Sequence, residues 1–218
     1  MRIAPEGLYQ ILLSFALALM LGVLSLIYRG HWTAVLSAAC GLAGLFFCYF
    51  FRDPERAVPG APSLLLSPAD GTVVIVKEVD EPYFLKSRAR QVSIFMSPLD
   101  VHINRIPIAG TVEYKQYYPG KFLPAFRDKA SIDNEQVHLG VSTPQGKVLM
   151  KQIAGILARR VMCRAVVGDC VAQGQRYGLI KLGSRVDLFF PAEWEVKVKL
   201  NDRVQGGLTT IAAIKYLT

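Results

Sequence analysis

The chain has 218 residues and a formal net charge of +8 at pH 7, with 52% hydrophobic and 19% charged residues. This composition excludes a disordered, collagen-like or disulfide-stapled chain, because enough apolar surface is present to offset the entropy lost on ordering. The apolar residues are unevenly spread, since residues 8–28 and 32–51 contain no charged side chain. The remainder, residues 52–218, has the composition of an ordinary soluble domain.

The two uncharged segments predict a membrane anchor in residues 1–51. Each is about as long as the roughly 20 residues that a helix needs to cross a bilayer, and only a helix pairs its own amides inside lipid. Three residues separate the segments, so the two helices must form an antiparallel transmembrane hairpin. A secretory signal is disfavoured, because the apolar stretch is long and only Arg2 precedes it. A helical hairpin buried in a soluble protein is the other alternative.

Charges around the hairpin predict its orientation. Arg2, Arg52 and Arg56 flank the outer ends while Arg29 lies in the link, so the positive-inside rule favours a cell-membrane protein whose domain faces the cytoplasm. The first 51 residues hold two arginines and one glutamate, +1 of the net +8, which leaves +7 on the domain. Such a domain is attracted to an anionic membrane surface. No block of lysine and arginine indicates nucleic-acid binding, and four cysteines without a C-x-x-C pair indicate a reducing compartment.

Residues 52–218 show the pattern of a mainly β domain. Short apolar or alternating runs recur between clusters of Gly, Pro, Asp and Asn, which break strands or supply turns. Sustained helical periodicity is absent. The expected strands are Gly71–Val79, Gln91–Met96, Gly110–Tyr117, Val137–Ser142, Lys147–Ile153, Val161–Val166, Arg185–Phe190 and Glu195–Leu200.

Two segments, residues 169–174 and 202–207, share the pattern D-x-V-x-x-G. Gly-Thr-Val also occurs twice, at residues 71–73 and 110–112. An aspartate-led turn, an inward valine and a glycine at a second turn describe one β-hairpin corner used twice. This arrangement resembles the hammerhead corner of biotinyl and lipoyl carrier domains, although no carrier lysine lies between the halves. We therefore expect a hammerhead-like β domain in which the repeat is architectural.

One polar cluster follows the expected strand Gln91–Met96. Asp100, His102, Asn104 and Arg105 lie within six residues of one another, and a histidine that titrates near neutrality can give and take protons there. A solvated loop in which His102 is simply hydrogen-bonded is the alternative. No metal is expected, because the domain has one other histidine and no H-x-H or H-E-x-x-H spacing.

The dipeptide Gly183-Ser184 interrupts an otherwise apolar stretch. A glycine carbonyl is the least hindered target for the next residue's hydroxyl, so Ser184 Oγ can attack it and convert the amide to an ester. Elimination of that ester leaves dehydroalanine, and hydrolysis then releases ammonia and leaves a pyruvoyl group. An ordinary turn is the alternative, as it is for Asp70, which lies in the turn-like sequence Pro68-Ala69-Asp70-Gly71.

Five motifs occur in one order along the chain. They are Phe51-Arg52-Asp53-Pro54-Glu55-Arg56, Ser67-Pro68-Ala69-Asp70-Gly71, the segment Met96–Arg105, Gln152-Ile153-Ala154-Gly155 with Ala158-Arg159-Arg160, and Gly183-Ser184-Arg185-Val186-Asp187. In this order they closely resemble the short form of the phosphatidylserine decarboxylase proenzyme family. The likeness covers essentially the whole chain, including its hydrophobic amino-terminal part.

This resemblance implies that residues 52–218 form a pyruvoyl-dependent carboxy-lyase that cleaves itself between Gly183 and Ser184. The fragments 1–183 and 184–218 would stay together as a heterodimer. The pyruvoyl group made from Ser184 would be the cofactor, with no metal and no pyridoxal phosphate. Phosphatidylserine in the bilayer would form a Schiff base with that group, lose CO₂ and leave as phosphatidylethanolamine, a step of phospholipid biosynthesis.

The resemblance carries over to individual residues only in part. Asp70 and Ser184 match the family's self-cleavage residues, and His102 matches its decarboxylation histidine. Arg105 stands where longer bacterial relatives have a second histidine, so the group that activates Ser184 is left open. Because its guanidinium stays charged, Arg105 is expected to bind the substrate carboxylate or phosphate. His138 is an alternative activator, although its apolar neighbours fit an ordinary strand.

Two interpretations without decarboxylation stay open. A membrane-anchored serine hydrolase would use Ser184 with Lys181 as base, but residues three apart on a strand lie on opposite faces. A hammerhead adaptor without catalysis is the second.

Overall fold

The computed structural model describes residues 2–120, 134–155, 161–181 and 184–214. The chain divides into two compact units, residues 1–55 and residues 56–218. Gly183, at the expected cleavage site, and Ala158–Arg160 of the fourth motif lie outside the described residues. Ser184, on the other side of the expected cleavage site, lies inside them.

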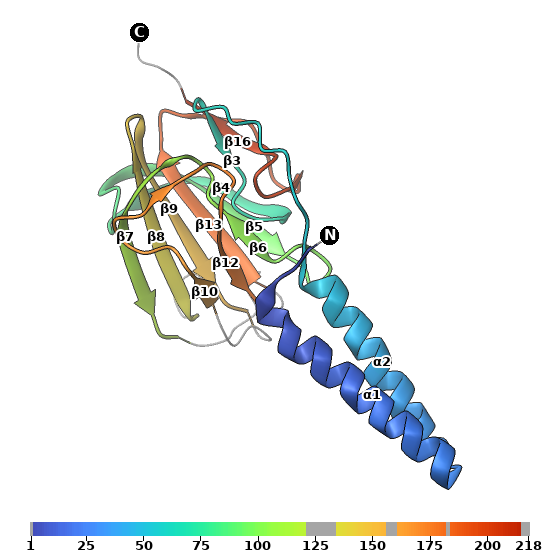
Figure 1. Ribbon diagram of the computed structural model, residues 1–218. Coiled ribbons are helices and arrows are strands. Elements are labelled where there is room, and N and C mark those ends of the chain that lie inside the picture. The colour runs from blue at the N-terminus through green and yellow to red at the C-terminus, as the bar shows by residue number, and fades with distance from the viewer. Residues whose placement is uncertain (1, 121–133, 156–160, 182–183, 215–218) are drawn as a thin grey trace. The chain divides into compact units, whose positions relative to one another are not determined.

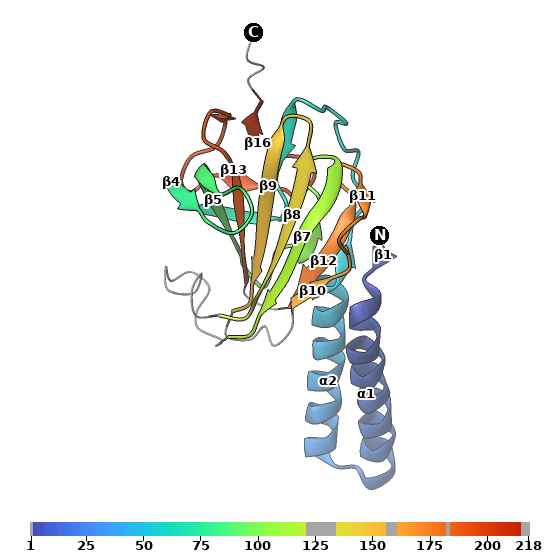
Figure 2. The ribbon, with the colours of Figure 1, turned by 90° about the vertical axis from the view of Figure 1, so that its left-hand side faces the viewer.

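The first unit is a helical hairpin closed by a short two-stranded ladder. Its elements are β1 (Arg2–Ile3), the 3-10 turn η1 (Pro5–Gly7), α1 (Leu8–Tyr28), α2 (His31–Phe50) and β2 (Arg52–Asp53). The two helices lie side by side (Figures 1 and 2), and the Ser37 hydroxyl on α2 donates to the Ala18 carbonyl on α1 at 2.7 Å. Helix α1 ends where Arg29 adopts a left-handed conformation, with a φ of 50°.

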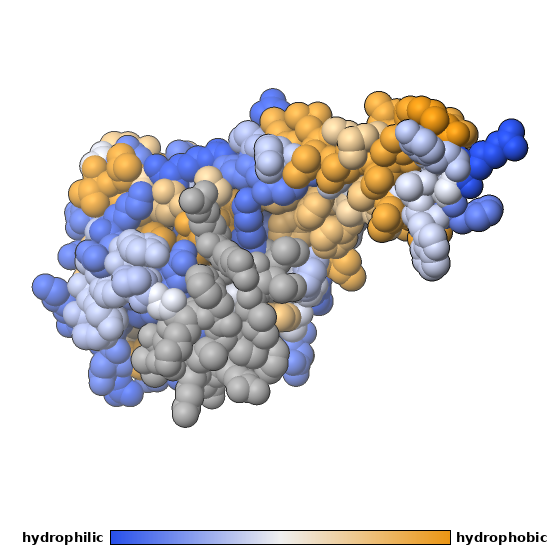
Figure 3. All heavy atoms as spheres, turned by 90° about the horizontal axis from the view of Figure 1, so that it is seen from below, coloured by the Kyte–Doolittle hydropathy of each residue, from blue (hydrophilic) through white to orange (hydrophobic). Residues whose placement is uncertain are grey.

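Hydrophobic side chains cover the outer surface of this hairpin (Figure 3). Leu26 and Trp32, for example, are each 82% exposed. Exposing so large an apolar surface to water is unfavourable. Both helices are long and apolar enough to cross a membrane. The predicted helical hairpin is confirmed, and its insertion into a bilayer stays a prediction.

The second unit is built on an eight-stranded antiparallel sheet in the order β11-β7-β8-β9-β13-β5-β4-β15 (Figure 2). Its strands are β4 (Gly71–Glu81), β5 (Ser87–Met96), β7 (Gly110–Tyr118), β8 (Gln136–Thr143), β9 (Gly146–Ile153), β11 (Cys170–Val171), β13 (Ser184–Pro191) and β15 (Arg203–Val204). Strand β13 is therefore central, paired with β5 on one side and β9 on the other.

Two three-stranded sheets complete this unit. Their orders are β10-β12-β6 and β14-β16-β3, with strands β3 (Leu64–Leu66), β6 (Ile103–Arg105), β10 (Val161–Cys163), β12 (Arg176–Ile180), β14 (Glu195–Val196) and β16 (Thr210–Ala213). The main hydrophobic core joins side chains of the large sheet, such as Val186 and Leu188, to Tyr177 of β12 and Leu65 of β3. The small sheets thus help to enclose one face of the large one.

Alternation along β13 divides its side chains between the two faces of the large sheet. Val186, Leu188 and Phe190 belong to the main core, and Ser184 shares their face by register. We call this the core face. Arg185 and Asp187 lie on the opposite face, which we call the open face.

The repeated D-x-V-x-x-G segments form equivalent corners at the two edges of the large sheet. Asp169 accepts the Val166 backbone N–H, and Asp202 accepts that of Lys199, each at 2.9 Å. Strand β11 then pairs with the start of β7, and β15 with the start of β4, which are the two Gly-Thr-Val segments. The predicted twofold use of one β-corner is confirmed.

The mainly β prediction is also confirmed, and each of the eight expected strands overlaps an observed one. The observed β10 and β14 are shorter than expected, with three and two residues. The unexpected strands β3, β6, β11, β12, β15 and β16 have two to five residues. Runs this short carry too little alternation to be recognised.

Candidate active site

Ser184 begins the central strand β13 and is completely buried. It is paired with Met96, the last residue of β5, and its hydroxyl lies 3.5 Å from the Met96 sulfur. A thioether is a weak hydrogen-bond acceptor. The hydroxyl is therefore held in place without being tied to a strong acceptor, which leaves its oxygen available for chemistry.

A chain of neutral amides continues from Met96 on the core face. The Asn104 side-chain N–H lies 3.8 Å from the Met96 sulfur, and the Gln152 Nε2–H donates to the Asn104 carbonyl oxygen at 2.8 Å. Both amide side chains are completely buried. A Cβ on Gly178 would lie 2.7 Å from Gln152 Nε2, so glycine there leaves room for this contact. We call Ser184, Met96, Asn104 and Gln152 the core-face cluster.

His102 is fully buried just before β6. Its Nδ1 lies 2.9 Å from the Asp100 carbonyl oxygen, and because a carbonyl can only accept, Nδ1 carries the proton and Nε2 is the basic atom. The His102 carbonyl accepts the Ile180 N–H at 3.4 Å. The histidine backbone is thus held beside the end of β12, four residues before Ser184.

Asp70 is held by a cation. Both carboxylate oxygens pair with the Arg56 guanidinium, at 2.6 and 2.7 Å, and the Gly206 N–H donates to one of them at 2.8 Å. Register places Asp70 at the same end of the sheet as Ser184, since Thr72, Phe95 and Arg185 form one row. The starts of β4 and β13 are two strand spacings apart, roughly 10 Å. The structure brings Asp70 to this end of the sheet, in contact with Arg56.

Arg105 is buried, with 4% of its surface exposed. Its Nη1 donates to the Gly174 carbonyl at 3.1 Å, and a Cβ on Gly207 would lie 2.9 Å from its Cδ. Gly174 and Gly207 are the equivalent glycines of the two repeated corners. The side chain therefore joins the two halves of the repeat, and its predicted contact with substrate stays a prediction.

The open face carries charged groups in place of neutral ones. Arg185 and Asp187 form a two-pronged ion pair, at 2.7 and 3.0 Å, with at most 1% of either side chain exposed. Gln91 donates to Asp187 at 3.2 Å and to Ser93 at 3.0 Å. Burial of two ions is tolerated only when their hydrogen-bonding capacity is met in this way.

His138 and Lys151 are cross-strand neighbours on the same open face. His138 is 2% exposed, and its ring lies against those of Tyr83 and Tyr118, with centroids 5.2 and 4.5 Å away. Burial, together with a smaller contribution from the nearby Lys151 charge, lowers the pKa of His138 to about 3. The imidazole is therefore neutral at physiological pH. Its place on the face opposite Ser184 argues against His138 as the activator of that hydroxyl.

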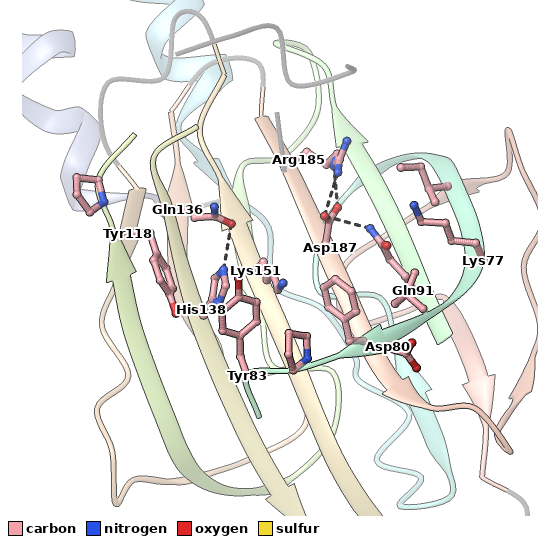
Figure 4. A pocket seen from close by; sticks show the side chains of 15 residues that line it. Lys77, Asp80, Tyr83, Gln91, Tyr118, Gln136, His138, Lys151, Arg185 and Asp187 are labelled. Atoms are coloured by element: carbon pink, nitrogen blue, oxygen red, sulfur yellow. Dashed lines mark hydrogen bonds and ion pairs between the residues drawn. The ribbon is translucent and has the colours of Figure 1, made fainter. Parts of the chain in front are cut away.

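The Lys151 ammonium lies over two aromatic rings, 4.7 Å from the Tyr83 centroid and 4.5 Å from the Phe189 centroid. Burial lowers the pKa of Lys151, and Glu81 and Asp187 oppose that shift. Cation–π contacts contribute about 0.5–2 kcal/mol each, whereas burying an ammonium costs several kcal/mol. A cavity of about 610 Å³ is lined by Lys151, Tyr83, Phe189 and Asp187, among other residues (Figure 4).

Sequence reasoning assigned no role to Asn104 or Gln152. Gln152 stands in a row with Val137 and Val186 on the core face. A glutamine in such an apolar row is the sequence feature that could have indicated a functional residue. The pairing of Asp70 with Arg56 was also missed. Among the described residues, no three His, Cys, Asp or Glu side chains gather as metal ligands would.

A family model described as phosphatidylserine decarboxylase matches residues 43–212 of this chain. The chain belongs to this family. The phosphatidylserine decarboxylase proenzyme of Symbiobacterium thermophilum is 50% identical over 185 residues, 84% of this chain and 85% of that protein. The proenzyme of Chlorobium phaeobacteroides is 39% identical over 213 residues, 98% and 100% of the two chains. That of Amoebophilus asiaticus is 46% identical over 183 residues, 84% and 81%.

The resemblance read from the five motifs is thereby confirmed at the level of the family. These phosphatidylserine decarboxylase relatives are named as proenzymes, that is, as precursors of active enzymes.

Proposed function

We propose that this protein decarboxylates phosphatidylserine to phosphatidylethanolamine and CO₂, as a step of phospholipid biosynthesis, with a pyruvoyl group made from its own Ser184. The observation that carries the proposal is the buried position of Ser184 in the fold of a chain that belongs to the phosphatidylserine decarboxylase family. Ser184 is fully buried at the start of the central strand, beside a neutral polar cluster. This is an unusual position for the serine of an ordinary turn.

The surroundings of Ser184 fit such a group. Met96, Asn104 and Gln152 are uncharged and buried, and the pairing of β13 with β5 fixes the backbone at residue 184. A dry, neutral site protects an electrophilic carbonyl from side reactions with water. When present, a pyruvoyl group supplies a carbonyl that withdraws electrons from the substrate Cα as CO₂ leaves.

Cleavage between residues 183 and 184 would leave the two fragments in one folded unit. The carboxy-terminal fragment begins with β13, which is paired along its length with β5 and over five residues with β9. Both neighbours belong to the amino-terminal fragment. Their backbone hydrogen bonds and the shared core hold the two fragments together as a heterodimer.

His102 is proposed as the group that moves a proton at the substrate Cα. Its Nδ1–H is fixed by the Asp100 carbonyl, so proton exchange falls to Nε2. Asp70 is proposed to act in self-cleavage from its place beside Arg56, and Arg105 to bind an anionic part of the substrate. Ser184 must lose its hydroxyl proton as it attacks the preceding carbonyl, and the group that accepts this proton is left open.

The helical hairpin is proposed to anchor the protein in the cell membrane, with the basic domain on the cytoplasmic side. Deleting residues 1–51 should give a soluble protein that still cleaves itself, because β3 to β16 all lie beyond the deletion. Turnover of phosphatidylserine in vesicles should fall more than turnover of a short-chain substrate in micelles. Equal losses on both substrates would show that the hairpin belongs to the folded catalytic core.

The experiment that tests the reaction is release of CO₂ from phosphatidylserine labelled in the serine carboxyl group. The proposal expects labelled CO₂ and phosphatidylethanolamine in equal amounts. A serine hydrolase using Ser184 and Lys181 would instead release fatty acid or a soluble headgroup without CO₂. An adaptor would leave the lipid unchanged.

A further inference from the structure

The cavity on the open face has no part in the proposed decarboxylation, because alternation along β13 places the Ser184 side chain on the other face of the sheet. Its volume of about 610 Å³ lies within the usual range for small-molecule sites. Strands β4, β5, β8, β9 and β13 supply most of its lining (Figure 4). A pocket built on sheet strands rather than on loops is a rigid one.

Two polar atoms in this cavity lack partners. His138 donates from Nε2 to the Gln136 side-chain oxygen at 3.0 Å, which leaves Nδ1 as a bare acceptor. That Nδ1 is buried and has no hydrogen-bond partner among the residues that the structure describes. A buried nitrogen of this kind is rare unless a water or ligand completes it.

The Lys151 ammonium is the second polar group of this cavity without a hydrogen-bond partner among the described residues. Lys151 is 91% buried, since 9% of its surface is exposed, and in the described part of the chain its side chain contacts two aromatic rings but no hydrogen-bond acceptor. The three donor hydrogens of its ammonium thus have no acceptor among the described residues. A lysine so deeply buried without a carboxylate partner is uncommon.

Nearby carboxylates are committed elsewhere. Asp187 binds Arg185 through both oxygens and also accepts from Gln91. Glu81 accepts three backbone N–H groups, those of Tyr83, Phe84 and Leu85, at 2.8–3.0 Å. Among the described residues, these two carboxylates therefore attract Lys151 at long range but form no ion pair with it.

We propose that this cavity is a binding site for a small oxyanion that carries a hydroxyl group. A phosphate or carboxylate oxygen accepts hydrogen bonds from Lys151, and the hydroxyl donates to Nδ1 of His138. Because Nδ1 is buried, the second contact requires the rings packed against His138, those of Tyr83 and Tyr118, to shift. The rings of Tyr83, Tyr118 and Phe189 cover the carbon skeleton. The charged lining is net positive by one, with Lys77, Lys151 and Arg185 against Asp80 and Asp187, which favours an anion.

This chemistry has two sources, a free metabolite and a hydroxylated lipid headgroup. The two sources are distinguished by acylating the lysines of the mature protein, with its helical hairpin present, and by measuring the modification with peptide mass spectrometry. The free probes are glycerol 3-phosphate and glycerate, and the lipid probe is a nanodisc of phosphatidylglycerol compared with one of phosphatidylcholine. The proposal expects at least one probe to slow labelling of Lys151, while Lys147 on the same strand but outside the cavity keeps its rate.

Protection by the free anions alone identifies a metabolite site, and protection by phosphatidylglycerol alone identifies a headgroup site. Calorimetry with the protective probe then compares Lys151→Met with the matched variant Lys147→Met. Loss of a charge-assisted hydrogen bond should weaken binding by roughly tenfold or more in the first and leave the second unchanged. No protection of Lys151 by any probe, or equal affinity of the two variants, overturns the proposal. The labelling arm uses unaltered protein, so a folding defect in Lys151→Met cannot obscure the answer.

Discussion

The core-face cluster and the open-face cavity share three strands, β9, β13 and β5, yet their chemistry is opposite. The core face presents a hydroxyl, a thioether and two carboxamides around Ser184. The open face presents Arg185, Asp187 and Lys151, all buried and all charged. One residue of offset along a strand therefore separates a neutral site from an ionic one. Neutral surroundings suit a reactive carbonyl, whereas charges suit recognition of an ion.

The largest expected effects concern the proposed active site around Ser184 and separate its two chemistries. His102→Ala should still cleave but lose about 10²- to 10⁴-fold in turnover, the usual contribution of a positioned general acid. Asp70→Ala should accumulate uncleaved chain. A gel and a CO₂-release assay on the same samples measure both steps, with Asp169→Ala as a control that removes another turn aspartate.

If His102→Ala remains full-length, this histidine serves maturation and the division of labour is wrong. If Asp70→Ala cleaves as fast as the wild type, the ion pair with Arg56 is structural and nothing more.

A smaller effect is expected on the open face, where stability rather than turnover should respond. Asp187→Ala leaves the Arg185 charge buried without its carboxylate, which should destabilise the fold by about 3–5 kcal/mol. Asp80→Ala removes an exposed carboxylate at the same cavity and should cost at most about 0.5 kcal/mol. Denaturant unfolding in a non-ionic detergent measures both.

The double variant Arg185→Met/Asp187→Leu sharpens this test, because it removes both charges together. It should recover most of the stability that Asp187→Ala loses. A single variant as stable as the wild type would show that the pair is not as isolated from water as its burial indicates.

The smallest expected effect is a pH dependence that comes from His138. Its folded-state pKa, lowered to about 3, lies below the ordinary 6.5, so between these values the unfolded chain binds a proton that the folded chain does not. Stability should therefore fall as pH falls from 6 to 4, by about 1.4 kcal/mol per unit from this residue alone. Parallel pH profiles for the wild type and His138→Gln would contradict a buried neutral imidazole.

Patterns local in sequence were enough to predict the helical hairpin, the longer strands and the repeated corner. Charge-free segments of helical length, period-two alternation and a D-x-V-x-x-G repeat each act over a short span. The face on which a side chain lies also follows from alternation once a strand is known, which separates Ser184 from Arg185.

Contacts that depend on strand register could not be predicted from the sequence. Gln152 on β9 meets Asn104 on β6 across 48 positions. The two strands belong to different sheets, so no local pattern specifies their contact. The same reason hides Lys151 beside His138, and the partner of Asp70 lies 14 residues away on a segment without regular structure. The type of chemistry was predictable here, while its immediate partners were not.

The most direct test of the account is the intact mass of the purified, unmodified protein. The account predicts two chains, residues 1–183 and residues 184–218, with the second lighter by one ammonia than a fragment that starts with serine. Ser184→Ala should give one full-length chain in the same preparation. A single full-length mass for the wild type, or fragments that also appear in Ser184→Ala, would contradict a self-made pyruvoyl group at this position.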